Sequence, residues 1–477
     1  MQSGKRKWLI LTVIVIKMII DGLDLSMLNI ALPVIRTSLS VTSGAVVWAV
    51  SAYTITVSAT VLFFGRLGDM IGKAKFYKIG LAIYTMSTLF GGIVNSFPLL
   101  VAARIVQALG ASCTMANSQG IIVTAFPQEQ RGRAIGIYGG AMSIGALAGP
   151  TVGGFIVANM HWQYIFLLNV PIAVIALVLG LRFFPKDIPV EKEKLDYPGV
   201  FIYALAVIPL LYSLQVGFAA GYGSIQFLSG IAVSIIALTF FIITQRRKTA
   251  PLLDLSIFRN PLYSVGVFSA SVLFLSNMFR NIIIPFYMQG ALGMPPDRAG
   301  LYMSISPIVL LLVTPLSGFL TDRFNGEHLT IIGQVFNLAG TLLISTLKKS
   351  SNVIMLVVYL CIASFGTALF QAPNNTLIIS SLPMNKLGIG GASSMAIRNI
   401  GMALGIALAT AVLYGSMSNF LGYPVTDYIS GIGQDDAFIF GMRNAFCAAA
   451  VFCLFGIIAS IVSAKKHGGG ALKTREF

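Results

Sequence analysis

The sequence predicts an all-α integral membrane protein with fourteen transmembrane helices. Hydrophobic residues make up 56% of the 477 residues and charged residues only 10%, whereas a soluble domain carries about 25% charged residues. The mean hydropathy is correspondingly high, at +0.85. Apolar runs of about 20 residues, enough to cross about 30 Å of hydrocarbon, recur along the whole chain with short connections. Lipid therefore surrounds most of this protein.

The apolar runs form a group of six, a pair and a second group of six. The fourteen spans are predicted near residues 8–32, 45–67, 77–96, 98–125, 134–157, 161–184, 198–218, 224–245, 262–290, 297–320, 329–347, 352–380, 390–414 and 437–463. This grouping predicts an N-terminal six-helix half (1–197), a two-helix insert (198–248) and a C-terminal six-helix half with a short tail (249–477).

The basic residues predict the orientation of the chain in the membrane. Most of the 32 Lys and Arg residues fall in loops on the same side as the N-terminus, such as Lys5–Lys7 and Arg246–Lys248. Cytoplasmic loops carry this excess, so we expect both termini in the cytoplasm. The first apolar run has no small-residue cleavage site and is predicted to be a retained span.

Composition and motifs argue against several functions and leave a membrane-embedded enzyme or sensor only as a weak alternative to transport. The net charge of +16 resides in short loops, not on a polar face, so no nucleic-acid partner is expected. The four cysteines lie inside apolar runs and the three histidines are scattered, so no metal site is predicted. The chain has neither a Gly-x-x-x-x-Gly-Lys-Ser/Thr phosphate loop nor a polar catalytic cluster, which argues against an ATPase or a membrane-embedded enzyme or sensor.

The two halves contain a related motif at corresponding positions. Gly65-x-Leu67-x-Asp69 follows the second span, and Gly318-x-Leu320-x-Asp322 follows the second span of the C-terminal half. Such internal repeats are typical of secondary transporters, whose binding site lies near the midplane between the repeats.

Four motifs resemble those of the major facilitator superfamily, specifically its fourteen-helix drug:proton antiporter branch. In chain order they are Asp24-x-Ser26-x-x-Asn29-x-Ala31-Leu32-Pro33 in the first span, Gly65-x-Leu67-x-Asp69-x-x-Gly72-Lys73-x-Lys75 after the second, Arg104-x-x-Gln107-x-x-Gly110 in the fourth and Gly145-x-x-x-Gly149-Pro150-x-x-Gly153-Gly154 in the fifth. The resemblance covers essentially the whole chain.

The resemblance implies a fold and a function. The fold is two six-helix bundles plus two additional central helices. The function is export of amphiphilic small molecules or drugs from a bacterial cell across its plasma membrane in exchange for protons. The proton gradient supplies the energy, so no cofactor is expected, and the protein is expected to work as a monomer surrounded by lipid. The alternative within transport is export or flipping of a lipid-like or anionic metabolite.

The first span is unusual because it holds Asp21 and Asp24, the two carboxylates that lie away from the ends of the predicted spans. Their spacing, with Lys17 four residues before Asp21, puts all three on one helix face. Two neighbouring carboxylates in a low dielectric do not both ionise easily, and proton coupling requires a carboxyl that loads and unloads a proton. The alternative is a permanent ion pair, Lys17 with Asp21 or Asp24 with an arginine from another helix. Asp24 and Asp21 are the predicted proton carriers. The resemblance favours Asp24, with its proton transfer influenced by Arg104, whereas Asp21 lies outside the family motif.

The loop after the second span has a predicted gating role. Gly65 and Gly72 permit a tight turn, and Lys73 faces anionic headgroups. The resemblance implies a latch on one conformation, in which Asp69 pairs with Arg131 and Arg133; the alternative is that the charges only orient the spans. In the fifth span, Gly145, Gly149, Pro150, Gly153 and Gly154 permit close helix packing, and the resemblance adds a pliable seal that favours export.

Polar residues within other spans are candidates for lining a substrate cavity. Arg280 lies in the ninth span, where a buried charge requires a partner. It would either bind an anionic or zwitterionic substrate or neutralise Asp21 across the cavity. The remaining candidates either line the cavity or hold helices together: Asn117, Asn281, Gln371 and Asn374.

Overall fold

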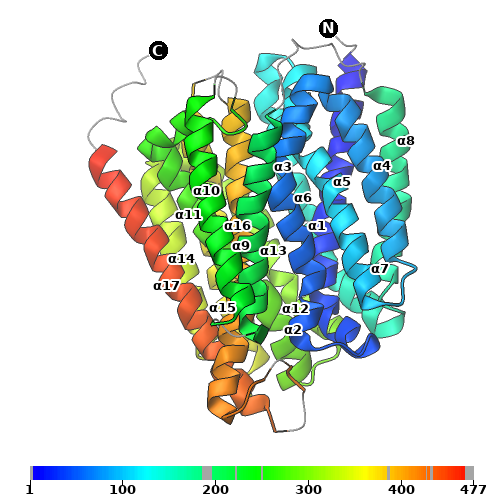
Figure 1. Cartoon of the computed structure of the whole chain (residues 1–477), viewed down its shortest axis with the longest axis vertical. Coiled ribbons are helices and arrows are strands. Elements are labelled where there is room, and N and C mark those ends of the chain that lie inside the picture. The colour runs from blue at the N-terminus through cyan, green and yellow to red at the C-terminus, as the bar shows by residue number, and fades with distance from the viewer. Residues whose placement is uncertain are drawn as a thin grey trace.

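A computed structural model describes residues 4–184, 196–220, 223–248, 251–383, 387–425, 427–429 and 433–467. The described part of the chain is helical, with the long helices aligned along one axis (Figure 1). Twelve of its helices are long and apolar enough to cross a membrane. The other two predicted spans are also helical. They are α1 (Gly4–Ser38), made more polar by Lys17, Asp21 and Asp24, and α4 (Lys73–Gly91), which begins with lysines. The predicted fold class is therefore confirmed.

The first six predicted spans contain α1 and α4 together with α2 (Ser43–Val46), α3 (Trp48–Ile71), α5 (Phe97–Ala125), α6 (Gln128–Asn159), α7 (Tyr164–Leu167) and α8 (Asn169–Phe183). The sixth span, predicted as one helix, is interrupted at Leu168. Pro171 follows three residues later and has no N–H to donate to the preceding turn. The N-terminal helices lie together on the right in Figure 1.

Two long helices form the predicted central pair, α9 (Tyr197–Ala220) and α10 (Ile225–Arg247). They pack on each other, and α9 also contacts α3 and α16, one helix from each six-span group. Asp196 joins the two ends, since it accepts from Gln245 Nε2 at 2.7 Å and pairs with Lys248. Burial alone would raise the pKa of Asp196. The hydrogen bonds from Lys248, Gln245 and the Gly199 N–H together outweigh this effect, so the pKa lies below its usual value.

The short helix η1 (Leu255–Arg259) precedes the last six predicted spans. These spans contain α11 (Pro261–Phe286), η2 (Tyr287–Ala291), α12 (Pro296–Met303), α13 (Ile305–Arg323), α14 (Gly326–Ser345), α15 (Val353–Ser380), α16 (Leu387–Leu421) and α17 (Asp435–His467). The tenth predicted span is divided at Ser304, where Pro307 has no N–H to donate to Met303. In Figure 1, α1 begins and α17 ends at the same, upper end of the molecule.

The lower end of the molecule joins the two six-span groups. The largest buried apolar cluster includes Met27 and Ile30 of α1, Phe279 of α11 and Phe438 of α17. Around it, Gln289 Nε2 donates to the Ile30 carbonyl at 2.9 Å. The two groups are therefore in direct contact at this end.

Candidate functional site

The Asp24 carboxylate lies at the centre of a buried polar cluster between α1, α4 and α5. Arg104 Nη1 of α5 donates to Asp24 Oδ2 at 2.6 Å, and Gln107 Nε2 donates to Asp24 Oδ1 at 3.2 Å. Asp24 is 4% exposed and Arg104 is 0% exposed. Of the two alternatives for Asp24, the structure therefore contains the ion pair with an arginine from another helix. A charged pair at this depth is stable only when both members are hydrogen-bonded.

Neighbouring groups hold Arg104 in place. Its Nε donates to the Ala49 carbonyl of α3 at 3.0 Å, and its guanidinium lies over the Tyr53 ring at 4.5 Å. Gln107 accepts from Arg104 and donates to Thr88 Oγ1 of α4 at 2.9 Å. The cluster therefore connects four helices, with Asp24 on α1, Arg104 and Gln107 on α5, and their further partners on α3 and α4. Gln107 belongs to the same motif as Arg104, but it was not predicted from the sequence to be a site residue. No sequence signal indicated Tyr53.

A second ion pair lies one turn earlier on α1. Lys17 Nζ contacts Asp21 Oδ1, and the same ammonium lies 3.7 Å from the centre of the Tyr84 ring. Both residues are buried. Asp21 Oδ2 has no hydrogen-bond partner within the described residues. Asp21 is thus paired locally with Lys17, the alternative that the sequence left open, and not with Arg280.

Tight packing joins the acidic helix to α6. A Cβ added to Gly145 would lie 2.0 Å from the Ile19 carbonyl oxygen, and one added to Gly149 would lie 2.4 Å from the Ser26 Cβ. On the facing helix, a Cβ on Gly22 would lie 2.4 Å from the Met142 carbonyl oxygen. Only glycine allows this approach. Gly22 was not predicted, because a single glycine in an apolar run does not reveal its partner.

A different face of α6 meets α12. A Cβ on Gly154 would lie 2.5 Å from the Pro296 carbonyl oxygen, and one on Gly300 would lie 2.1 Å from the Pro150 carbonyl oxygen. A hydrogen bond of 2.6 Å joins Thr151 to Ser304 beside this contact. The predicted glycine motif therefore contacts α1 on one side and the second group of helices on the other.

The loop motif forms the turn between α3 and α4. Gly72 ends α3 with a φ of +127°, a value that favours glycine, and its N–H donates to Gly68. Asp69 pairs with Lys73, whereas Arg131 Nε donates to the Phe126 carbonyl at 3.1 Å. The side chain of Arg133 lies outside the described residues. A Cβ added to Gly65 would lie 3.6 Å from the Ala116 Cβ, so this glycine is in ordinary van der Waals contact with α5.

The remaining candidates are placed at different positions. Asn117 lies between α3 and α5, donates to the Phe64 carbonyl at 3.2 Å and packs against Gly68. Asn374 donates to the Gly266 carbonyl at 3.1 Å. Gln371 and Asn281 are partly exposed. Asn117 and Asn374 therefore contact neighbouring helices directly.

Arg280 lies in the middle of the C-terminal group. It is 7% exposed, and its guanidinium donates to Thr341 Oγ1 at 3.3 Å, to Thr367 Oγ1 at 3.4 Å and to Asn277 Oδ1. All three acceptors are neutral. The structure thus leaves Arg280 far less compensated than Arg104.

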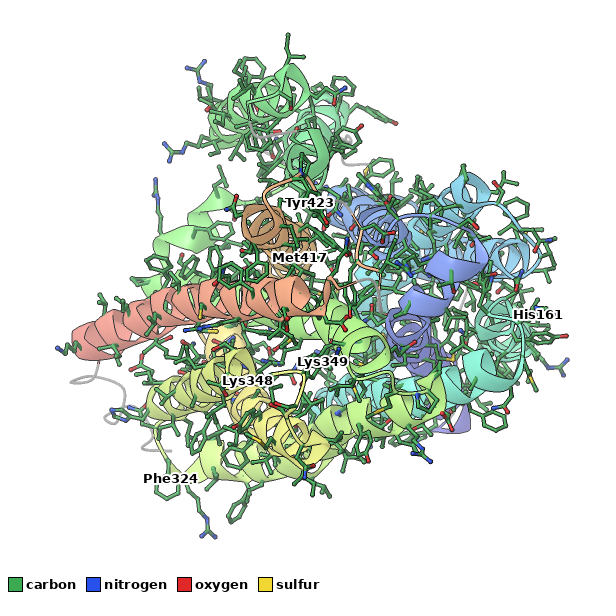
Figure 2. All side chains as sticks on the ribbon, turned by 90° about the horizontal axis from the view of Figure 1, so that it is seen from below. His161, Phe324, Lys348, Lys349, Met417 and Tyr423 are labelled. Carbon is green, nitrogen blue, oxygen red and sulfur yellow. The ribbon has the colours of Figure 1, made fainter. Side chains whose placement is uncertain are left out.

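The lower end of the molecule carries a polar connection that the sequence did not indicate. Asp427, between α16 and α17, accepts from Arg36 Nη1 at 3.0 Å and from the Ser43 N–H at 2.8 Å. Lys349, near the centre of the view from below in Figure 2, pairs with Asp435 at 2.6 Å. The Arg36, Ser43 and Asp427 cluster, here termed the strap, joins residues almost 400 positions apart.

Comparison with known proteins shows similarity along the entire chain. Residues 14–406 and 266–476 match the Major Facilitator Superfamily. The riboflavin transporter RibZ of Clostridioides difficile is 31% identical over 97% of this chain and 98% of its own length. The multidrug resistance protein Stp of Mycobacterium tuberculosis is 28% identical over 83% of this chain and 74% of its own. A bacterial homologue of the human lysosomal transporter Spinster shares the fold, with a TM-score of 0.66, 13% identity and coverage of 97% and 98%.

Proposed function

Because this chain belongs to the Major Facilitator Superfamily and is therefore a multi-pass membrane transporter and not an enzyme, we propose that it exports amphiphilic small molecules in exchange for protons. The observation that carries the proposal is the fully buried pair of Asp24 with Arg104. Protonation of Asp24 would remove the charge that holds the guanidinium, so the pair has two states that differ by one proton. Asp21, paired with Lys17, is a second proton-binding group in this proposal.

The proposal assigns the remaining motifs to the transport cycle. Residues 1–197 and 249–477 form the two halves, and residues 198–248 form the insert, in the plasma membrane of a bacterium with both termini in the cytoplasm. The loop with Asp69 and Lys73 latches the cytoplasmic end, and the Gly145–Gly154 segment seals the other end. Alternating access then consists of rocking one half against the other around the substrate.

The coupling assignment is tested with Asp24→Asn, which keeps the size of the side chain and removes the proton-binding group. We expect transport driven by a pH gradient in inside-out vesicles to fall to the level of vesicles without the protein. Exchange of substrate at equal concentrations on both sides should continue, because it needs no net proton movement. Asp436→Asn, at an exposed position, is the matched control. Wild-type gradient-driven transport in Asp24→Asn would refute the coupling role.

The strap gives a second prediction, on the conformational equilibrium. Asp427→Ala removes the carboxylate that accepts from Arg36 and Ser43 and leaves the neutral Tyr428 carbonyl as their shared acceptor, so the lower end should open more often. A hydrogen bond to a charged group contributes about 1.5–3 kcal/mol, so we expect about tenfold faster labelling of a cysteine at Ala31, which is 0% exposed, by a membrane-impermeant maleimide. Asp436→Asn again serves as the control. An unchanged labelling rate would show that the strap does not hold this end closed.

A second candidate substrate is a flavin-like heteroaromatic molecule. The similarity to a riboflavin transporter over 97% of this chain favours it. A flavin ring offers several hydrogen-bonding atoms, which the hydroxyls and amides around Arg280 match in kind. Uptake or efflux of radiolabelled riboflavin in proteoliposomes tests this candidate, and equal movement in protein-free liposomes would exclude it.

A further inference from the structure

The two six-span groups differ in their buried charge. Among the described side chains of the first group, the two buried cations of the spans each have a carboxylate, Lys17 with Asp21 and Arg104 with Asp24. In the second group, Arg280 and Arg398 have no carboxylate within 4.0 Å in the described part of the chain. The first group is therefore neutral at its centre, whereas the second carries unmatched positive charge.

Arg398 lies in a different environment from Arg280. Its guanidinium lies 5.6 Å from the centre of the Phe274 ring, whose face stabilises a cation, and donates to Asn375. Its buried Nε has no hydrogen-bond partner within the described residues. Arg280 has only neutral oxygens from α11, α14 and α15. An arginine is not deprotonated in proteins, so the charge at Arg280 persists at a depth where an unpaired charge is costly.

An incoming anion can replace the two threonine hydroxyls as hydrogen-bond acceptors of Arg280. The distances to Thr341 and Thr367, 3.3 and 3.4 Å, lie beyond the usual range for N–H···O hydrogen bonds. Thr367 is also held by Asn337 Nδ2 at 2.9 Å and Thr341 by its own helix at 2.8 Å, so both hydroxyls have partners without the arginine. An incoming oxyanion could therefore replace them at little loss. The planar guanidinium fork fits a carboxylate or a phosphate with two parallel hydrogen bonds.

We propose that Arg280 is the anion-recognition site of this transporter, and that its substrate is an amphiphile carrying a carboxylate or a phosphate. This inference rests on the proposed transport function and names its substrate class. The second group would then bind the anionic head of the substrate, while the first group carries the proton on Asp24. The two tasks are assigned to different helices, so they can be tested separately.

The test is equilibrium binding to the full-length protein in detergent with two matched probe pairs, 2-naphthoate against 2-naphthamide and riboflavin phosphate against riboflavin. We expect the wild type to bind the acid of at least one pair about tenfold more tightly than its neutral partner. Arg280→Gln should abolish this preference, and Arg280→Lys should retain part of it. Arg398→Gln should leave the preference intact.

Several outcomes would overturn the assignment. These are equal affinity for acid and neutral probes in the wild type, an unchanged preference in Arg280→Gln, or loss of the preference in Arg398→Gln as complete as in Arg280→Gln. Equal weakening of both members of a pair by Arg280→Gln would indicate a structural role instead. If chloride saturates the site and no organic acid binds, Arg280 holds an inorganic anion and does not recognise the substrate.

The Asp24→Asn variant separates this inference from the coupling proposal. It should bind the acidic probes with the wild-type preference while losing gradient-driven transport. If it transports normally and Arg280→Gln loses the preference, the coupling role fails and anion recognition stands. Melting temperatures of all variants show whether a loss reflects unfolding.

Discussion

Arg104→Gln is expected to lower the free energy of unfolding by about 3–5 kcal/mol, because it leaves the Asp24 carboxylate buried without its cation. Asp24 is only 4% exposed, and its other partner, Gln107, donates a single hydrogen bond at 3.2 Å. Gln107 would also lose the arginine from which it accepts. The measurement is thermal or denaturant unfolding of the purified protein in detergent.

The double variant Asp24→Asn/Arg104→Gln supplies the internal control. Two neutral amides remove both charges together, so most of the lost stability should return, whereas gradient-driven transport should not. This difference separates the structural contribution of the pair from its role in proton coupling. A double variant as unstable as Arg104→Gln alone would show that Asp24 is not the main partner of Arg104 in the folded protein.

Gly145→Ala should have the second large effect, on assembly of the helix bundle. The added Cβ would lie 2.0 Å from the Ile19 carbonyl oxygen and 2.8 Å from the Leu23 N. These are backbone atoms, so α1 and α6 can relieve the overlap only by moving apart. Overpacking costs about 1–3 kcal/mol in well-packed cores, and we expect the upper part of that range with a smaller yield of monodisperse protein.

Gly140→Ala is the matched control on the same helix. An added Cβ at Gly140 meets no atom within 4 Å, so this variant should melt at the wild-type temperature or slightly above it, because alanine favours helix. Melting temperatures by static light scattering and fluorescence compare the two. If Gly145→Ala is as stable as Gly140→Ala, the close approach of α1 and α6 is not needed for folding.

Local sequence properties predicted the fold. Hydropathy alone locates the spans, because each must match the thickness of the membrane without help from distant residues. The details that it does not show are local too: a one-residue interruption before Pro171 and another before Pro307 divide two of the confirmed spans into two helices each. The family predicted from four motifs is confirmed, because motif residues occur in fixed order along the chain.

The partners within the site were harder to predict. The sequence named the pair of Lys17 with Asp21 as one alternative, since four residues bring them onto one helix face. The partner of Asp24, Arg104, is 80 positions away in the chain, and nothing in a single sequence specifies which helices adjoin. The strap was missed for the same reason. The sequence did not decide whether the partner of Arg280 is Asp21 or a substrate. In the structure, neutral oxygens surround its guanidinium.

The contact between α6 and α12 has a mechanical consequence. Gly154 faces the Pro296 carbonyl, and Gly300 faces the Pro150 carbonyl, so backbone lies on backbone with no side chain between them. Apart from the hydrogen bond between Thr151 and Ser304 beside it, such a contact has few side chains whose rotamers must change when the two helices pivot. We therefore expect the contact between α6 and α12 to be a pivot about which one end of the molecule closes while the other opens, with the hydrogen bond between Thr151 and Ser304 as its main restraint.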